Sequence, residues 1–157
     1  MNILFVCRQN IFRSVAAQYL FEKFLKDSNI YGIKVMSAGT ESTPEPMNTA
    51  VINALLSYGI DVSNHKQRRL SKKDVSDADV IAVMGEGQKI FMKKNYGIDV
   101  PYYKMTCCGL DEPLLDVEET DKVHTKAQED EYIIKTIEYI HDTIPKFYEN
   151  MGKYKKH

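Results

Sequence analysis

A cysteine, an arginine and a serine stand near the N-terminus at a spacing that can bind and attack a phosphoryl group. Cys7 is followed after five residues by Arg13 and Ser14. A cysteine thiolate is a nucleophile, and the planar guanidinium of arginine can donate to two oxygens at once, which lysine cannot do. Backbone N–H groups of the intervening loop can surround an oxyanion, and Ser14 can donate its hydroxyl to the thiolate. The spacing predicts a phosphate-binding loop that carries its own nucleophile.

The residues inside this loop have distinct expected tasks. Asn10 tolerates a positive φ, which a loop wrapped around an anion needs, and its amide can tie the loop to neighbouring turns. The alternative for Asn10 is an ordinary turn residue. The others are expected to surround the phosphate, the last three mainly through backbone N–H groups: Arg8, Gln9, Ile11 and Phe12. Phe12 is also a candidate wall of the substrate site or a packing residue.

The loop is expected to join a buried strand to a helix. Residues 2–6 are a compact apolar run, and a helix beginning near Arg13 shows an apolar face at helical spacing. The positive end of that helix and Arg13 would both favour the thiolate form of Cys7. A single buried cysteine is otherwise commonly a packing residue, so this position between strand and helix is what indicates a catalytic role.

The rest of the chain alternates short apolar strands with helical patterns. Further strands are expected at 34–38, 79–84 and 102–104, and further helices at 48–58, 86–95 and 130–143, the last stopped by Pro145. This order predicts an α/β fold: a single domain over 1–157, with three α/β/α layers around a central four-stranded parallel twisted sheet. Ligands of such sheets bind beyond the carboxyl ends of the strands, where Cys7 lies.

Composition narrows the possible partners and the compartment. The net charge is -1, which gives no reason to expect nucleic acid or a membrane surface as a partner. No apolar run approaches the roughly 18 residues of a membrane span, and no signal peptide is visible. Three cysteines do not suit a disulfide scaffold, so we expect a reducing, cytoplasmic environment. The four histidines are widely scattered, and we expect neither a metal nor another cofactor.

The segment from Cys7 to Ser14 resembles the C-x-x-N-x-x-R-S loop of the low-molecular-weight protein tyrosine phosphatases, a family related to the thioredoxin-coupled arsenate reductases. Further similarities follow in chain order over nearly the whole length: the turn 37–40, the helix start 46–50, and the segment from Gly59 to His65 with Arg69-Leu70 after it.

The resemblance implies a two-step phosphomonoesterase. Cys7 forms a phosphocysteine while a carboxylic acid protonates the leaving group, and the carboxylate then activates water. Arg13 and the loop amides bind the phosphoryl oxygens. The implied partners are a phosphorylated protein, most simply one carrying phosphotyrosine, or a small phosphomonoester. Phosphate, vanadate and sulfate are the expected anions of the loop, and no cofactor is needed.

The general acid is the part of the sequence that departs from the family pattern. The family has an aspartate directly before a proline, whereas this chain reads Leu110-Asp111-Glu112-Pro113. Glu112 or Asp111 is therefore expected to be the acid, with Asp116 as a third candidate. Leu114-Leu115 stand where eukaryotic-type members have two tyrosines.

Two other functions compete with the phosphatase. The segment after Tyr103 that carries Asp111, Glu112 and Asp116 is called the acid loop here. Its departure from the family pattern would suit a non-catalytic phosphate- or phosphopeptide-binding module. An arsenate reductase needs a cysteine just after the third strand, and residues 84–87 contain none. Cys107 and Cys108 are adjacent in the acid loop instead, as packing residues or as a reversible cap for an oxidised Cys7. Phosphotyrosine, small esters and phosphoarginine all remain open as substrates, although Ile11 is not the small polar residue expected for phosphoarginine.

Overall fold

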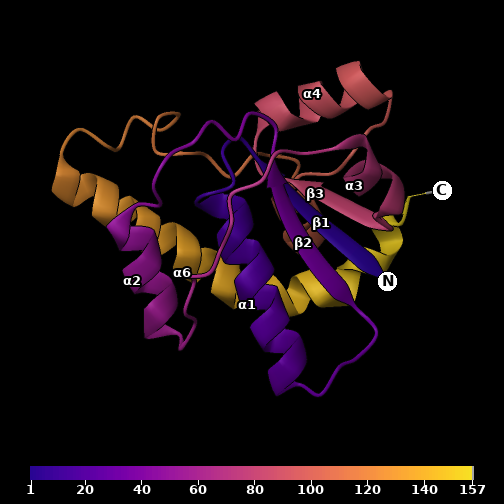
Figure 1. Ribbon diagram of the computed structural model, residues 1–157, viewed down its shortest axis with the longest axis horizontal. Coiled ribbons are helices and arrows are strands. Elements are labelled where there is room, and N and C mark those ends of the chain that lie inside the picture. The colour runs from indigo at the N-terminus through magenta and orange to yellow at the C-terminus, as the bar shows by residue number, and fades with distance from the viewer. Residues whose placement is uncertain (157) are drawn as a thin grey trace.

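The computed structural model describes residues 1–156 and is built on a parallel sheet (Figure 1). Its strands are β1 (Asn2–Cys7), β2 (Lys34–Gly39) and β3 (Val80–Val83), in the order β2-β1-β3. Cys7 lies opposite Gly39 of β2, and Val6 lies opposite Val83 of β3. The carboxyl ends of all the strands therefore meet at one edge, with Cys7 at the centre.

Helices cover both faces of this sheet. α1 (Arg13–Asp27), α2 (Thr49–Ser57) and α6 (Lys126–Asn150) belong to one face, and α5 (Tyr103–Cys108) packs against α6. α3 (Lys72–Asp77) and α4 (Glu86–Tyr96) cover the other, and a 3₁₀ turn, η1 (Met151–Tyr154), follows α6. This is the expected three-layer arrangement.

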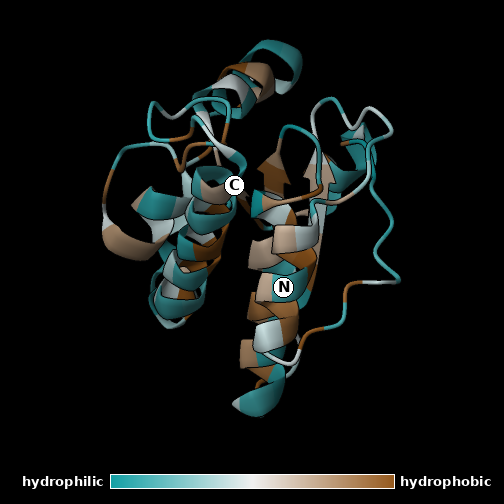
Figure 2. Ribbon diagram, turned by 90° about the vertical axis from the view of Figure 1, so that its left-hand side faces the viewer, coloured by the Kyte–Doolittle hydropathy of each residue, from teal (hydrophilic) through white to brown (hydrophobic). Residues whose placement is uncertain are grey.

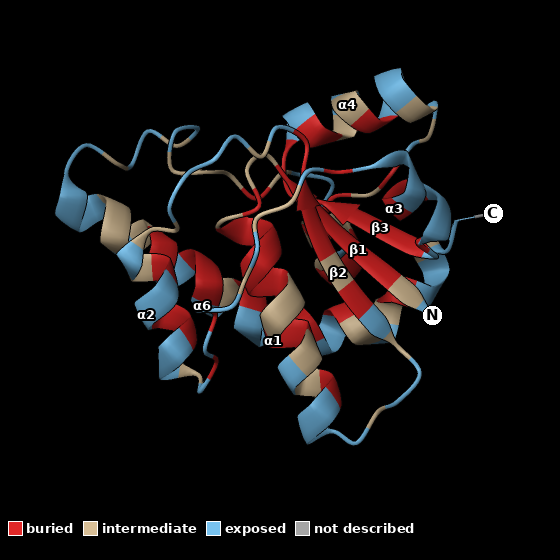
Figure 3. Ribbon diagram, viewed as in Figure 1, coloured by how far each residue is buried: buried red, intermediate tan, exposed pale blue. Residues whose placement is uncertain are grey.

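Alternation along β1 explains why both faces are covered. Ile3, Phe5 and Cys7 pack into the core shared with α1 and α6, whereas Leu4 and Val6 pack into the core shared with α3 and α4. Successive residues of a strand point to opposite faces. Since both sets are apolar, β1 is buried from Ile3 to Cys7 (Figure 3), while the connecting loops are mostly hydrophilic (Figure 2).

The prediction of a fourth strand at 102–104 was wrong. Tyr102 forms one isolated bridge to Val83, and α5 begins at the next residue. Tyr103 is fully buried: its ring stacks on Phe147 at 5.4 Å, and its hydroxyl lies 2.8 Å from Thr143 of α6. This packing against α6 outweighs the β propensity of the tyrosines.

The prediction that Pro145 stops the last helix was also wrong, since Pro145 lies inside α6. Proline removes a helical bond to the carbonyl four residues earlier, that of His141. Both residues are exposed, so this carbonyl is on the solvent side of the helix. Phe147 and Met151, beyond the proline, are buried in the core and hold the last turns in place. The helix also starts earlier than expected, with a capping box between Thr125 and Gln128.

Candidate active site

The loop after β1 curls around the sulfur of Cys7. The Cys7 side chain is buried, and the backbone N–H of Asn10 donates to its Sγ at 3.3 Å. The Oγ of Ser14, at the start of α1, lies 2.9 Å from the same sulfur. The structure thus brings Cys7, Asn10 and Ser14 together at the N-terminal end of α1.

Asn10 ties the loop to the neighbouring turns. Its φ is +61°, in the left-handed region that asparagine tolerates. Its fully buried amide donates to Ser14 Oγ at 3.0 Å and to Ser37 Oγ at 2.8 Å, and it accepts from the backbone N–H of Arg68 at 3.1 Å. Segments from β2 and from the chain before α3 are therefore joined at one side chain.

Gly39 allows β2 to approach this loop closely. A β-carbon at position 39 would lie 2.6 Å from the carbonyl oxygen of Arg8 and 2.9 Å from the backbone of Gln9. Since both neighbours are backbone, a side chain there would displace the phosphate-binding loop. Thr40, the next residue, donates its N–H to the carbonyl of Cys7 at 3.0 Å.

His65 supports the loop from outside. Its Nε2 lies 3.1 Å from the carbonyl oxygen of Asn10, and its Nδ1 lies 3.1 Å from the hydroxyl of Tyr19. A carbonyl only accepts, so Nε2 carries the hydrogen and Nδ1 accepts from Tyr19. Burial lowers the pKa of His65, although its bond to Asn10 acts in the opposite direction. Burial therefore favours the neutral form of His65.

We expect the stability of the protein to fall below about pH 6.5, the ordinary pKa of histidine, partly because of His65. The folded-state pKa is lowered, so the unfolded chain takes up the proton first. The stability that His65 contributes is present above the unfolded pKa and is lost as the pH falls through the folded one. Melting temperatures measured from about pH 7.5 to about pH 5.5 should decrease less steeply in His65→Gln than in the unaltered protein. Equal slopes would contradict this role.

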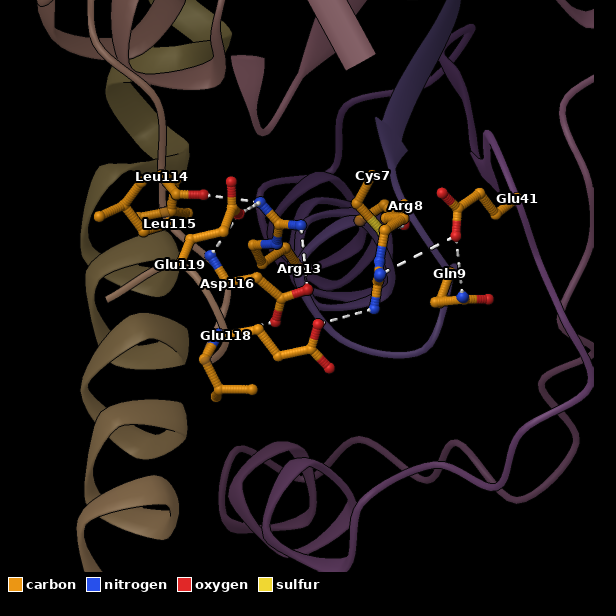
Figure 4. Close-up of polar contacts among 12 residues, drawn as sticks. Cys7, Arg8, Gln9, Arg13, Glu41, Leu114, Leu115, Asp116, Glu118 and Glu119 are labelled. Carbon is orange, nitrogen blue, oxygen red and sulfur yellow. Dashed lines mark hydrogen bonds and ion pairs between the residues drawn. The ribbon is translucent and has the colours of Figure 1, made fainter. Parts of the chain in front are cut away.

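Arg13 is buried and reaches the loop that precedes α6. One of its terminal nitrogens donates to the carbonyl of Leu114 at 2.8 Å and lies 3.5 Å from Glu119; the other lies 3.2 Å from Asp116 (Figure 4). Glu119 also accepts the backbone N–H of Asp116 at 2.9 Å. Several charge-assisted hydrogen bonds thus hold Arg13 and the acid loop together.

The three candidate acids lie in different places. Leu114 donates its N–H to the carbonyl of Met84, just after β3, at 2.8 Å, which fixes the acid loop against the sheet edge. After this anchor, the side chains of Asp116 and Glu119 reach Arg13. Asp111 and Glu112 are exposed, and Glu112 pairs with Lys104 at 3.1 Å. Asp116, the third candidate, lies beside Arg13, with its carboxylate 3.2 Å from the guanidinium.

A small pocket opens above the loop. Its lining includes Cys7, Arg13 and Asp116 but neither Asp111 nor Glu112, and Asn10 and Ser14 lie beneath it. Apolar side chains form part of the wall: Ile11, Phe12, Val51, Val117 and Ile133. The arrangement can hold a phosphoryl group between a nucleophile, a guanidinium and a carboxylic acid.

Some residues around the site were not singled out from the sequence. Glu118 pairs with Arg8 at 3.1 Å at the pocket mouth (Figure 4), and Glu45 and Glu129 complete the rim. They belong to three different segments, so no local motif marks them.

Within residues 1–156, no group of three or more acidic, histidine or cysteine side chains could hold a metal ion. None of the helices there is both long and apolar enough to cross a membrane.

Sequence comparison finds relatives of this chain among known phosphatases. A sequence profile of the low molecular weight phosphotyrosine protein phosphatases matches residues 2–155. EpsP of Ralstonia solanacearum, a probable low molecular weight protein-tyrosine-phosphatase, is 38% identical over 89 residues. That match spans 56% of this chain and 58% of the length of EpsP.

Solved structures share the fold. A low molecular weight protein tyrosine phosphatase from T. tengcongensis has a TM-score of 0.79 at 26% identity, covering 95% of this chain and 98% of its own. The arginine phosphatase YwlE with a phosphorylated active site serine has a TM-score of 0.82 at 21% identity, covering 98% and 97%. That identity shows a common fold alone. On the match over residues 2–155, the chain belongs to the low molecular weight phosphotyrosine protein phosphatase family.

Proposed function

We propose that this protein hydrolyses phosphomonoesters, most simply phosphotyrosine in proteins, through a phosphocysteine on Cys7. The observation that carries the proposal is that Cys7, Arg13 and Asp116 line one pocket, with the carboxylate of Asp116 3.2 Å from the guanidinium of Arg13. Nucleophile, anion receptor and proton donor are the three parts that this reaction requires.

The first step transfers the phosphoryl group to the enzyme. The thiolate of Cys7 attacks phosphorus, the bond from phosphorus to the leaving oxygen breaks, and the carboxylic acid of Asp116 gives its proton to that oxygen. Arg13 and the N–H groups of the loop bind the phosphoryl oxygens, on which negative charge is concentrated. Ser14 and the N–H of Asn10 stabilise the thiolate before attack and after release.

The second step regenerates the enzyme. The Asp116 carboxylate takes a proton from a water molecule, the water oxygen attacks phosphorus, and the bond from sulfur to phosphorus breaks. Orthophosphate leaves, and Cys7 is again a thiolate. We assign the acid to Asp116 rather than to Glu112 because Glu112 pairs with Lys104 outside the pocket.

Hydrolysis of an aryl phosphate, inhibited by vanadate, is the result that tests this function. A non-catalytic phosphate-binding module would instead bind phosphopeptides without turnover. An arsenate reductase would consume arsenate with thioredoxin and leave aryl phosphates intact. Only the phosphatase releases orthophosphate continuously in this assay.

The pocket mouth suggests which phosphorylated proteins are preferred. Glu45, Glu118 and Glu129 form its rim, and only Glu118 has a cationic partner, Arg8, among the ion pairs of residues 1–156. A phosphate dianion approaching this rim meets negative charge, and positive residues beside the phosphorylated one would offset the repulsion. We propose a preference for phosphorylated residues flanked by lysine or arginine.

Removing the unpaired rim charges should weaken that preference. For matched phosphopeptides with basic or neutral flanks, we expect the ratio of kcat/KM values to fall roughly five-fold in the double variant Glu45→Gln, Glu129→Gln, as for the loss of exposed charge pairs. Added salt should reduce the ratio in the unaltered protein. Glu138→Gln, an exposed acid of α6 that does not line the pocket, is the control. An unchanged ratio in the double variant would refute the preference.

A further inference from the structure

Two neighbouring thiols at the end of α5 lie outside the proposed catalytic pocket. The sulfurs of Cys107 and Cys108 are 3.0 Å apart, and both cysteines are free. The hydroxyl of Tyr139 lies 3.7 Å from Cys108 Sγ. Neither cysteine lines the pocket that contains Cys7. The proposed reaction uses only Cys7, so this pair has no assigned role.

Both cysteines line a second pocket, which gives small molecules access to them. It is open to solvent, has a volume of about 370 Å³, and lies between α5, the end of α6 and η1, with Met105, Lys146 and Lys153 among its other lining residues. Cys107 is almost fully buried and Cys108 half-buried. A reagent therefore reaches Cys108 first and finds the second sulfur directly behind it.

A disulfide fits this pair poorly. Consecutive Cα atoms lie about 3.8 Å apart, whereas disulfides usually need a Cα separation of roughly 4.4–6.8 Å and a bond of about 2.05 Å. Forming one would force the end of α5 out of helical geometry. A single atom bound to both sulfurs would require much less movement of the α5 backbone than a direct bond between them, because the sulfurs already lie 3.0 Å apart.

A structural zinc ion fits no better. Zinc in such sites takes about four protein ligands, and no group of three or more candidate ligands exists in the described part of the chain. Burial, and the neighbouring thiol of Cys108, raise the pKa of Cys107 to about 12. Cys107 is consequently a neutral thiol, and two adjacent thiolates would repel each other. A suitable ligand is therefore uncharged, prefers sulfur donors, and needs only two of them to complete its bonding.

We propose that Cys107 and Cys108 form a chelating site for trivalent arsenicals that carry one organic group. Such a molecule needs two sulfur ligands, and sulfur is the soft donor it prefers. With an organoarsenic(III) oxide, two As–S bonds form, the bonds from arsenic to oxygen break, and both thiol protons leave with that oxygen as one water molecule. Arsenic stays trivalent and sulfur is not oxidised, so no other reactant is required.

The proximity of the two sulfurs makes this site selective over a single thiol. Once Cys108 is bound to arsenic, Cys107 closes the ring within the same molecule, at a high effective concentration. A lone thiol such as Cys7 lacks this second step. The adduct should resist excess monothiol and be removed by a small dithiol.

Phenylarsine oxide is the probe that tests the site. Cys7→Ser protein, which retains the pair, should gain one phenylarsenic group by intact-protein mass spectrometry. Adding Cys107→Ser or Cys108→Ala should weaken binding at least roughly 100-fold, as expected for losing one arm of a chelate. Thermal melting of each variant checks that it is folded. Cys107 is buried, so Cys107→Ser can unfold the protein, whereas Cys108 is only half-buried and Cys108→Ala then provides the test.

Two results would overturn the proposal. One is an adduct that persists, with unchanged affinity, in folded Cys108→Ala protein. The other is an adduct that forms only when Cys7 is present. Both outcomes are independent of whether the protein hydrolyses phosphate esters, since the Cys7→Ser background has no phosphatase nucleophile.

Discussion

Cys7→Ser should lower the turnover of an aryl phosphate by roughly 10⁴-fold or more, the order seen when an enzyme loses its nucleophile. A serine hydroxyl remains protonated at neutral pH and has no base beside it, because the near neighbours of Cys7 Sγ are donors: Ser14 and the N–H of Asn10. The measurement is the steady-state rate of orthophosphate release at saturating substrate.

The same variant should still bind phosphate-like anions. Its smaller oxygen can accept from the same N–H, and Arg13 is held by contacts that do not involve Cys7. Vanadate, which can bond covalently to the thiolate, is less suitable than phosphate for this binding test. Cys108→Ser, the same chemical change outside the catalytic pocket, is the matched control and should retain full turnover. Substantial turnover by folded Cys7→Ser protein would refute the phosphocysteine mechanism.

Asp116→Asn should produce the second largest loss, about 10² to 10⁴-fold, as expected for removal of a general acid. Asparagine keeps an oxygen that can accept from Arg13, so the acid loop should stay in place while the transferable proton is lost. The loss should be large for a poor leaving group such as phenol and much smaller for 4-nitrophenol, which leaves without protonation. Comparing kcat/KM for the two substrates measures this difference, because kcat/KM reports the transfer of the phosphoryl group to Cys7 and not the later hydrolysis, in which Asp116 acts on both substrates alike.

The competing acids provide the control for this prediction. Glu112→Gln and Asp111→Asn should stay within a few-fold of the unaltered protein on both substrates, because both side chains are exposed and neither lines the pocket. If Glu112→Gln instead lost rate selectively on the poor leaving group, the acid would be Glu112 and the loop would have to rearrange during catalysis.

Much of the framework could be predicted from local sequence. The apolar run before Cys7 is a buried strand, and the helix with Arg13 at its start follows the loop directly. Such features depend on neighbours in the chain, because strand alternation and helical periodicity repeat every few residues. Asn10 at a positive φ follows from the same kind of reasoning.

The predictions of secondary structure were wrong where packing against distant parts of the chain determined the local structure. Tyr102 and Tyr103 favour a strand by propensity, yet Tyr103 is drawn into the core by Phe147 of α6. Pro145 indicates a helix end, yet α6 continues because Phe147 and Met151 are buried beyond it. In each case burial of large side chains outweighs a local preference of about 1 to 3 kcal/mol.

By itself the sequence determined the loop from Cys7 to Ser14, because its nucleophile, its turn residue and its arginine are close neighbours in the chain. Tertiary structure alone decided which carboxylate faces that loop. The N–H of Leu114 bonds to the carbonyl after β3, and Arg13 then holds Asp116, about a hundred residues away in sequence. A motif can specify contacts within one turn of chain. Which carboxylate pairs with the buried Arg13 depends instead on the hydrogen bond from Leu114 to Met84, because that bond positions a loop from a distant part of the chain.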